Sequence, residues 1–393
     1  MNNSTKLIYV TLLTVSSMSF GQQKKSITAP KATVAETKIS FWDLPNLKEA
    51  YMTTSPKDMK EGIEVDELGI SGENKEAIIK FAQEIAESKH GKYDSFLISH
   101  KGKFLFESYF KRGRINLPHF QASATKAYTS LAIARAIQLG YLTMADLQKP
   151  LVSFLPKLDP TKFVKGVEQI TLHQALTMRS GLRFTEEQLT KFRKNPKQYN
   201  GIDQIQAFLS LSKPITADTQ TYLYQGTDPI MVMQVLDAIV PESAEIFIKK
   251  EILDQLGINN YVWKKDLSGL PSGDSGMNIT SRDMLKLGSL VLNNGKWNGK
   301  QLLSTEYLAK ATSSITKPTE DWQPKTLSYG YLWYQTNLMI GEKNYAIKIA
   351  WGAGGNRIII VKELELVLVI TGHDIEDTIM TQISKTIIPA FVK

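Results

Sequence analysis

The 393-residue sequence contains no cysteine, only five histidines and no apolar run of the roughly 20 residues that a membrane-spanning helix needs. The missing cysteine excludes a disulfide scaffold and a thiolate metal site. The histidines show no H-E-x-x-H spacing, so we expect neither a metal site nor an organic cofactor. With 42% hydrophobic and 22% charged residues, the composition is that of a globular protein large enough for two lobes around a cleft.

The net charge of +8 is spread along the chain. The densest basic run, residues 191–197, is mixed with Phe192, Asn195 and Pro196 and lacks the regular interleaving of aromatic residues that would stack on bases. Such a run is typical of a solvated helix end, so no nucleic-acid partner is expected.

The first 21 residues have the pattern of a signal peptide. Lys6 precedes a short apolar run at residues 7–15, and the small residues Ser19 and Gly21 suit cleavage before Gln22. An uncleaved anchor is the alternative, but the run is short for a membrane span. The sequence therefore predicts an exported protein, periplasmic or secreted, with no stable membrane span once the leader is removed.

The remaining chain divides into a flexible approach segment, a mixed lobe formed by both chain ends and a helical lobe between them. A helix is expected at residues 73–88, capped by Ser71, and a β-hairpin turns at Lys101 and Gly102. Further expected elements are strands at 96–99, 103–109, 345–350, 357–361 and 366–370, and a helix at 378–392. The predicted boundaries are a 22–70 N-terminal extension, with its approach segment at 22–45, an α/β lobe at 71–124 and 287–393, and a helical lobe at 125–286, with the catalytic cleft between the lobes.

A nucleophile is suggested by the pattern S-x-x-K, which places a hydroxyl and an amine on one face of a helix. Four stretches match, a number close to what chance gives: Ser108/Lys111, Ser123/Lys126, Ser210/Lys213 and Ser314/Lys317. Lys213 and Lys317 precede prolines, which disfavour a continuing helix, and Ser108 lies in a strand-like run. Only Ser123 opens a long helical stretch, where free N–H groups favour developing negative charge.

Other nucleophile motifs give no support. No G-x-S-x-G elbow occurs, and residues 273–276, Gly-Asp-Ser-Gly, lack the context of a trypsin-like protease. We interpret them as a loop. His119, four residues before Ser123, is interpreted as structural, since Lys126 already shares the helix of the nucleophile.

Several short blocks occur in one order: FQASATK at 120–126, GYL at 140–142, VSFLP at 152–156, and ITL through LTMRSGL at 170–182. They resemble successive motifs of the serine β-lactamase and penicillin-binding protein superfamily over about residues 75–390. The nearest branch is the class-C-like group with DD-peptidases, esterases and 6-aminohexanoate-dimer hydrolases. The resemblance implies an α+β fold, in which an antiparallel sheet flanked by helices carries an inserted all-α lobe, with Ser123 as nucleophile and Lys126 as base.

The second motif of that superfamily, Tyr-x-Asn, matches Tyr224, Gln225 and Gly226. The resemblance implies that Tyr224 relays a proton, with Tyr222 as the rival and packing beside the cleft as the alternative role. Gly226 replaces the asparagine, which removes an amide that could hold substrate. We expect Gln225 to contact the substrate.

The third motif, Lys/His-Thr/Ser-Gly, matches Ala350, Trp351 and Gly352, followed by a glycine-rich turn. Gly352 allows a close backbone approach, and the N–H groups of Ser123 and Ala353 are expected to form an oxyanion hole. Trp351 and Gly352 are expected to line the substrate site, beside an aromatic set of Trp333, Tyr329, Tyr331 and Tyr334. The motif's cation is missing, and Lys348 is a candidate replacement.

The sequence therefore predicts an exported serine hydrolase that cleaves an ester or amide through an acyl-enzyme at Ser123. The expected partner is a small-molecule or short peptide substrate, with cell-wall material among the candidates. Two alternatives stay open: a β-lactamase or DD-peptidase proper, and a non-catalytic binder of cell-wall peptide, which the changes at Gly226 and Ala350 suggest.

Overall fold

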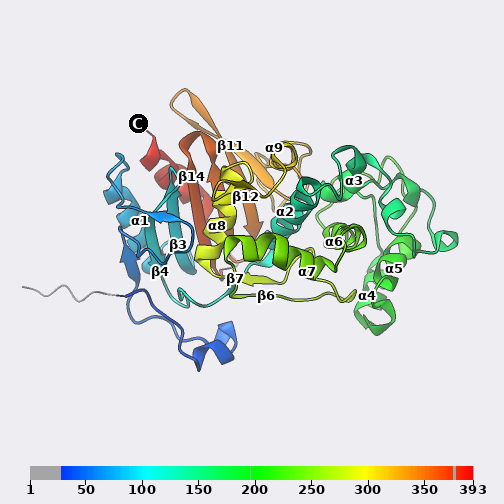
Figure 1. Ribbon diagram of the computed structural model, residues 1–393, viewed down its shortest axis with the longest axis horizontal. Coiled ribbons are helices and arrows are strands. Elements are labelled where there is room, and N and C mark those ends of the chain that lie inside the picture. The colour runs from blue at the N-terminus through cyan, green and yellow to red at the C-terminus, as the bar shows by residue number, and fades with distance from the viewer. Residues whose placement is uncertain (1–27, 195, 375–377, 393) are drawn as a thin grey trace, which may run out of the picture.

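The computed structural model describes residues 28–194, 196–374 and 378–392, and its central feature within them is a nine-stranded sheet (Figure 1). The strand order is β1-β4-β3-β14-β13-β12-β11-β10, with β2 beside β4. Neighbouring strands are antiparallel, except for the parallel pair β2 and β4. The strands are β1 (Tyr51–Thr53), β2 (Glu64–Val65), β3 (Tyr93–His100), β4 (Lys103–Tyr109), β10 (Ser328–Tyr329), β11 (Tyr334–Ile340), β12 (Lys343–Gly352), β13 (Asn356–Val361) and β14 (Leu366–Gly372).

Both faces of the sheet are covered, because every residue of β3, β13 and β14 is buried. Phe81 of α1 (Lys75–Ala86) packs edge-on against Phe96, the cross-strand partner of Ile370. Val367 lies three residues from Ile370, so it points to the opposite face. There α8 (Ser281–Leu292) packs so closely that a methyl group added at Gly288 would lie 2.5 Å from Val367. Continuous apolar strands are thus sandwiched between helices.

The helical lobe occupies the right half of Figure 1 and is built from short helices joined by 3₁₀ turns. The α-helices of the described chain are α1 (Lys75–Ala86), α2 (Thr125–Gln138), α3 (Leu172–Leu176), α4 (Glu186–Lys194), α5 (Asp203–Leu211), α6 (Thr227–Ile239), α7 (Ala244–Ile248), α8 (Ser281–Leu292), α9 (Thr305–Ala311) and α10 (Ile379–Gln382). Single turns of 3₁₀-helix are η1 (Glu36–Lys38), η2 (Phe41–Asp43), η3 (Ala122–Ala124), η4 (Ala145–Gln148), η5 (Leu151–Phe154), η6 (Pro160–Lys162), η7 (Val167–Gln169), η8 (Pro196–Tyr199), η10 (Asp254–Leu256), η11 (Lys362–Leu364) and η13 (Ile388–Phe391), and π-helical turns are η9 (Lys249–Leu253) and η12 (Ile383–Ile387).

Helix α2 lies at the junction of the two lobes. Twelve of its residues are buried, and it packs against α6 and α9 as well as β12. Just before it, β5 (His119–Phe120) joins a three-stranded sheet with β7 (Met277–Ile279) and β6 (Tyr261–Trp263), while β8 (Lys296–Trp297) and β9 (Lys300–Gln301) form a separate hairpin. This small sheet fixes the entry to α2 next to residues 273–276.

Some expected elements differ from the structure. Residues 28–45 are not a loose approach: Glu36 pairs with Arg114 at 3.0 Å, and Leu44 is buried. Asn74, not Ser71, caps α1, because its side chain accepts from the N–H of Ala77. The expected helix at 378–392 is an α, π and 3₁₀ succession over its described residues. The signal-peptide prediction lies outside the described residues.

Candidate active site

Ser123 stands in the turn that opens α2. The serine lies in the single 3₁₀ turn η3. The residue before the serine, Ala122, has a φ of 47°, a left-handed conformation that is strained for alanine. The Thr125 hydroxyl donates to the Ala122 carbonyl at 2.7 Å and holds this geometry. Strain of this kind concentrates at functional sites. The turn leaves the half-buried Ser123 at the N-terminal end of a buried helix.

Lys126 lies one helical turn beyond Ser123 and is only 4% exposed. Its Nζ donates to Ser123 Oγ at 3.2 Å and to the Asp274 carbonyl at 2.8 Å. No carboxylate among the described residues forms an ion pair with it. In its neutral form this amine is placed to accept the Ser123 hydroxyl proton.

Tyr224 presents its ring to Lys126, with Nζ 4.9 Å from the ring centroid. Within the described residues its hydroxyl makes no hydrogen bond to Ser123 or Lys126. The rival, Tyr222, is buried and its hydroxyl accepts from Gln323 at 3.4 Å. Burial also raises the pKa of Tyr222, although hydrogen bonds lower it in part. Tyr224 is therefore the tyrosine that faces the lysine.

Gly352, at the end of β12, touches the turn that carries the serine. An added Cβ would lie 2.1 Å from the Gln121 carbonyl and 3.0 Å from the Ala124 nitrogen, so no larger residue fits without movement. Ala353 follows directly and is exposed. The close approach places Gly352, the residue before Ala353, against the turn that carries Ser123.

An aromatic wall flanks this edge. It consists of Tyr224, Trp322, Tyr334 and Trp351, whose neighbouring ring centroids lie 5.4 to 6.5 Å apart. Trp322 is 58% exposed and was not among the residues that the sequence indicated. Of the expected aromatic set, Trp333, Tyr329 and Tyr331 are instead almost fully buried in the core.

The side-chain amide nitrogen of Gln225 is engaged in hydrogen bonds to neighbouring side chains. Its Nε2 donates to Asp228 Oδ1 at 2.7 Å and to Ser180 Oγ at 3.2 Å. Burial raises the pKa of Asp228 to about 6, despite the hydrogen bonds from Ser180 and Gln225 that lower it. Only the Oε1 of Gln225 is left for a substrate contact.

The place of the missing asparagine is taken by a residue that the sequence did not indicate. The Asp274 carboxylate stands over Gly226, where an added Cβ would lie 2.7 Å from Oδ2. Residues 273–276 are indeed a loop, as expected, but the loop belongs to the site. The glycine at position 226, where the motif has asparagine, is the sequence signal that could have prompted a search for a residue that takes the place of the asparagine side chain.

Other candidate residues lie elsewhere. His119 Nε2 contacts the buried Asp94 carboxylate at 3.0 Å, which fits its structural interpretation. The Ser108 hydroxyl is buried and donates to the Phe96 carbonyl. Burial lowers the pKa of Lys348, and the charged groups acting on it are Lys362 and Glu363.

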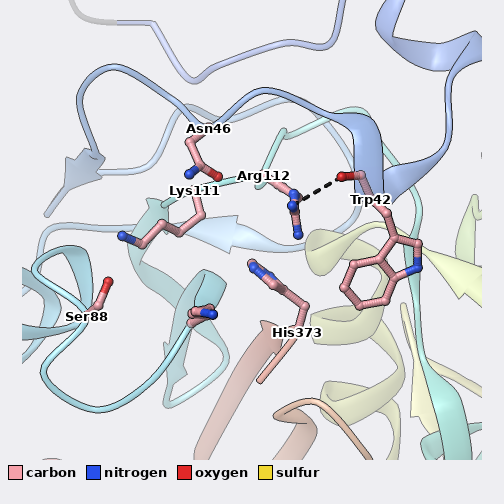
Figure 2. Close-up of a pocket in the computed structure, with 7 residues that line it drawn as sticks. Trp42, Asn46, Ser88, Lys111, Arg112 and His373 are labelled. Atoms are coloured by element: carbon pink, nitrogen blue, oxygen red, sulfur yellow. Dashed lines mark hydrogen bonds between the residues drawn. The ribbon is translucent and has the colours of Figure 1, made fainter. Parts of the chain in front are cut away.

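A pocket of about 360 Å³ lies under the N-terminal segment, away from these residues. Figure 2 shows Arg112 directed to the Trp42 carbonyl above His373. None of Ser123, Lys126 and Tyr224 lines it. Across the described chain, no group of three or more His, Asp or Glu residues is arranged to hold a metal, and no helix there is long and apolar enough to cross a membrane.

Comparison with known proteins decides the family. The Beta-lactamase family model matches residues 80–372. The chain belongs to the β-lactamase family. No curated protein matches the sequence.

Solved structures share the fold at low identity. A class C β-lactamase superposes with a TM-score of 0.62 at 14% identity, covering 80% of this chain and 95% of that one. A protein described as a 6-aminohexanoate-dimer hydrolase from Bacillus anthracis gives 0.60 at 20% identity, covering 80% and 81%. A D-stereospecific amidohydrolase from Streptomyces sp. gives 0.58 at 14%, covering 78% and 97%. The chain thus has the α+β serine-hydrolase fold of this family, as its motifs indicated.

Proposed function

We propose that this β-lactamase-family protein hydrolyses an ester or amide through an acyl-enzyme on Ser123. The observation that supports this most is the 3.2 Å contact between Lys126 Nζ and Ser123 Oγ, beside the Tyr224 ring. A buried amine paired with a half-buried hydroxyl is the arrangement of an activated nucleophile.

In the first step Ser123 Oγ attacks the substrate carbonyl carbon while Lys126 takes the hydroxyl proton. The N–H groups of Ser123 and Ala353 stabilise the oxyanion. The C–O or C–N bond then breaks, and the leaving group receives the proton through Tyr224, whose hydroxyl turns toward the lysine once substrate is bound. Water attacks the acyl-enzyme by the same route in reverse and releases the acid.

The substrate we propose is a small acyl compound or short peptide rather than a β-lactam. Ala350 and Trp351 replace the cation and hydroxyl that the superfamily motif would offer to a substrate carboxylate, and the Trp351 ring joins an apolar wall. Desolvating a carboxylate there without a cation would be costly. Aromatic walls favour apolar or flat acyl groups.

The test is labelling with a fluorophosphonate probe, which phosphonylates an activated serine with loss of fluoride. We expect peptide mapping to find the label on Ser123, and Ser123→Ala to abolish both labelling and p-nitrophenyl acetate turnover. Ser210→Ala, in a second S-x-x-K pair, is the matched control and should change neither. A folded protein that stays unlabelled yet binds muropeptide would support the non-catalytic binder instead. Nitrocefin turnover lost in Ser123→Ala would support a β-lactamase.

We also propose export through the leader at residues 1–21. N-terminal sequencing of the protein from the periplasmic or secreted fraction should begin at Gln22. A chain that keeps Met1 in the cytoplasm would contradict this.

A further inference from the structure

The loop at residues 273–276 places a carboxylate in the candidate active site. Thr129 Oγ1 donates to the Gly273 carbonyl at 2.8 Å, and Lys126 Nζ donates to the Asp274 carbonyl at the same distance. Both contacts come from the helix that follows the nucleophile. The loop is therefore fixed relative to Ser123, and the Asp274 side chain is carried with it to the space above Gly226.

The two oxygens of Asp274 differ. Oδ1 accepts from the Ser272 hydroxyl at 2.6 Å and from the Ser275 hydroxyl at 3.2 Å. Oδ2 accepts no hydrogen bond, and Asp274 forms no ion pair in the described part of the chain. The residue is half-buried. An ionised carboxylate oxygen is an acceptor, so Oδ2 keeps its hydrogen-bonding capacity for a donor on a ligand.

The electrostatic surroundings favour a positively charged ligand. Glu320 Oε1 accepts the backbone N–H of Tyr224 at 2.6 Å, which places a second carboxylate beside the site. Asp266 lies near enough that Asp274 adds to the effect of burial in raising the pKa of Asp266. Lys126 gives its hydrogen bonds to Ser123 and to a main-chain carbonyl, and the Lys264 ammonium lies over the Phe120 ring, 6.0 Å from its centroid.

The aromatic wall adds to this preference. Trp322 and Tyr224 stand at its open side, and ring faces attract ammonium groups. Carboxylates and aromatic faces together form a site that attracts a cation and repels a carboxylate.

We propose that Asp274 is a specificity-determining residue that binds a protonated amine of the substrate next to the scissile carbonyl. The inference rests on the proposed function, since the amine is bound for the reaction at Ser123. Asp274 Oδ2 accepts an N–H of the ammonium, and Gly226 keeps the space between them open. The favoured substrates are esters or amides of acids that carry a free amino group, and not their N-acylated forms.

Competition against p-nitrophenyl acetate hydrolysis tests the proposal. Alaninamide, in both enantiomers, is compared with N-acetylalaninamide, which keeps the amide but lacks the charge. We expect at least one enantiomer of alaninamide to inhibit at a concentration about tenfold lower than the acetylated form. Asp274→Asn should abolish that preference, which is measured as the ratio of the two inhibitory concentrations within the same variant and so does not depend on its overall turnover.

Two further variants separate recognition from folding. Gly226→Ala fills the space beneath the carboxylate and should also remove the preference for the amine. Asp266→Asn is the matched control: it removes a neighbouring charge that makes no contact with the ligand, so it should weaken the preference only slightly and not abolish it. Equal inhibition by both amides in the unmodified protein, or a preference that survives Asp274→Asn, would overturn the inference. An absence of p-nitrophenyl acetate turnover together with an unlabelled Ser123 would instead overturn the proposed function.

Discussion

The two sides of the candidate active site are built differently. On the nucleophile side, Lys126 donates to the main-chain carbonyl of Asp274, and Gly352 packs against the main chain of the turn that carries Ser123, where the space excludes even a methyl group. On the recognition side, Gly226 has lost a side chain, and Asp274 from a distant loop fills the space. The comparison indicates that the proposed reaction geometry is held by close packing, whereas the proposed recognition depends on one carboxylate that a distant loop carries.

Replacing the proposed base, Lys126, should lower turnover more than any other change considered below. We expect Lys126→Met to lower kcat/KM for p-nitrophenyl acetate by about a thousandfold or more, because general base catalysis contributes roughly 10² to 10⁴ and the hydroxyl is a weak nucleophile without it. Lys213→Met, at the exposed lysine of the Ser210/Lys213 pair, is the control and should leave turnover unchanged. A loss below about tenfold in Lys126→Met would assign the base to another group.

Adding one methyl group at Gly352 should give the next largest effect. In Gly352→Ala the new Cβ would lie 2.1 Å from the Gln121 carbonyl, so β12 or the serine turn must move. We expect kcat to fall about a hundredfold, since small displacements of a reacting group are costly, and unfolding free energy to fall by about 2 kcal/mol.

The control for that change is Gly341→Ala, at the turn between β11 and β12. Its added Cβ meets nothing within 4 Å, but its φ of 60° is strained for alanine. It should lower the thermal midpoint slightly and leave kcat unaltered. Equal kcat values in the two variants would show that the close approach at 352 has no role in catalysis.

Tyr224 lies between the two sides, and paired substitutions separate its two functional groups. Tyr224→Phe keeps the ring over Lys126 and removes only the hydroxyl, and we expect a loss of about 30-fold in kcat if the hydroxyl relays the proton. Tyr224→Leu removes the ring as well and should lose more. Full activity in Tyr224→Phe would mean that the tyrosine only packs its ring against Lys126, and it would exclude proton transfer through the hydroxyl.

The sequence allowed the nucleophile side to be predicted better than the recognition side. Ser123 and Lys126 are three residues apart in one helix, so their proximity follows from helix geometry. The buried strands β13 and β14 could be predicted equally well, because they are short apolar runs bounded by turns. Local patterns of this kind do not depend on the rest of the chain.

Asp274 and Trp322 could not be predicted in this way. Their approach to residues 224–226 depends on how distant segments pack, and no local pattern encodes that contact. The same reason explains the N-terminal segment, whose polar composition indicated flexibility although Arg112 and Arg114 bind its carbonyl groups. Single-residue strain, as at Ala122, is likewise imposed by its neighbours.

The smallest effect on turnover should come from Asp228, which holds Gln225 on the recognition side and changes stability rather than chemistry. Burial raises its pKa to about 6 in the folded protein, above the ordinary value of 3.8 that applies to the unfolded chain. The folded state therefore binds this proton more tightly, and the stabilisation is fully present below pH 3.8 and is lost as the pH rises through 6. At about 1.4 kcal/mol per pKa unit, the loss amounts to about 3 kcal/mol.

Urea unfolding of the protein and of Asp228→Asn between pH 4 and 7 measures this loss. Other groups titrate in both proteins, so the difference between their unfolding free energies isolates Asp228. We expect the unmodified protein to lose stability relative to the variant as the pH rises, with the change centred between pH 4 and 6. A constant difference would mean that the carboxylate stays ionised over this range, and that the hydrogen bonds from Ser180 and Gln225 outweigh its burial.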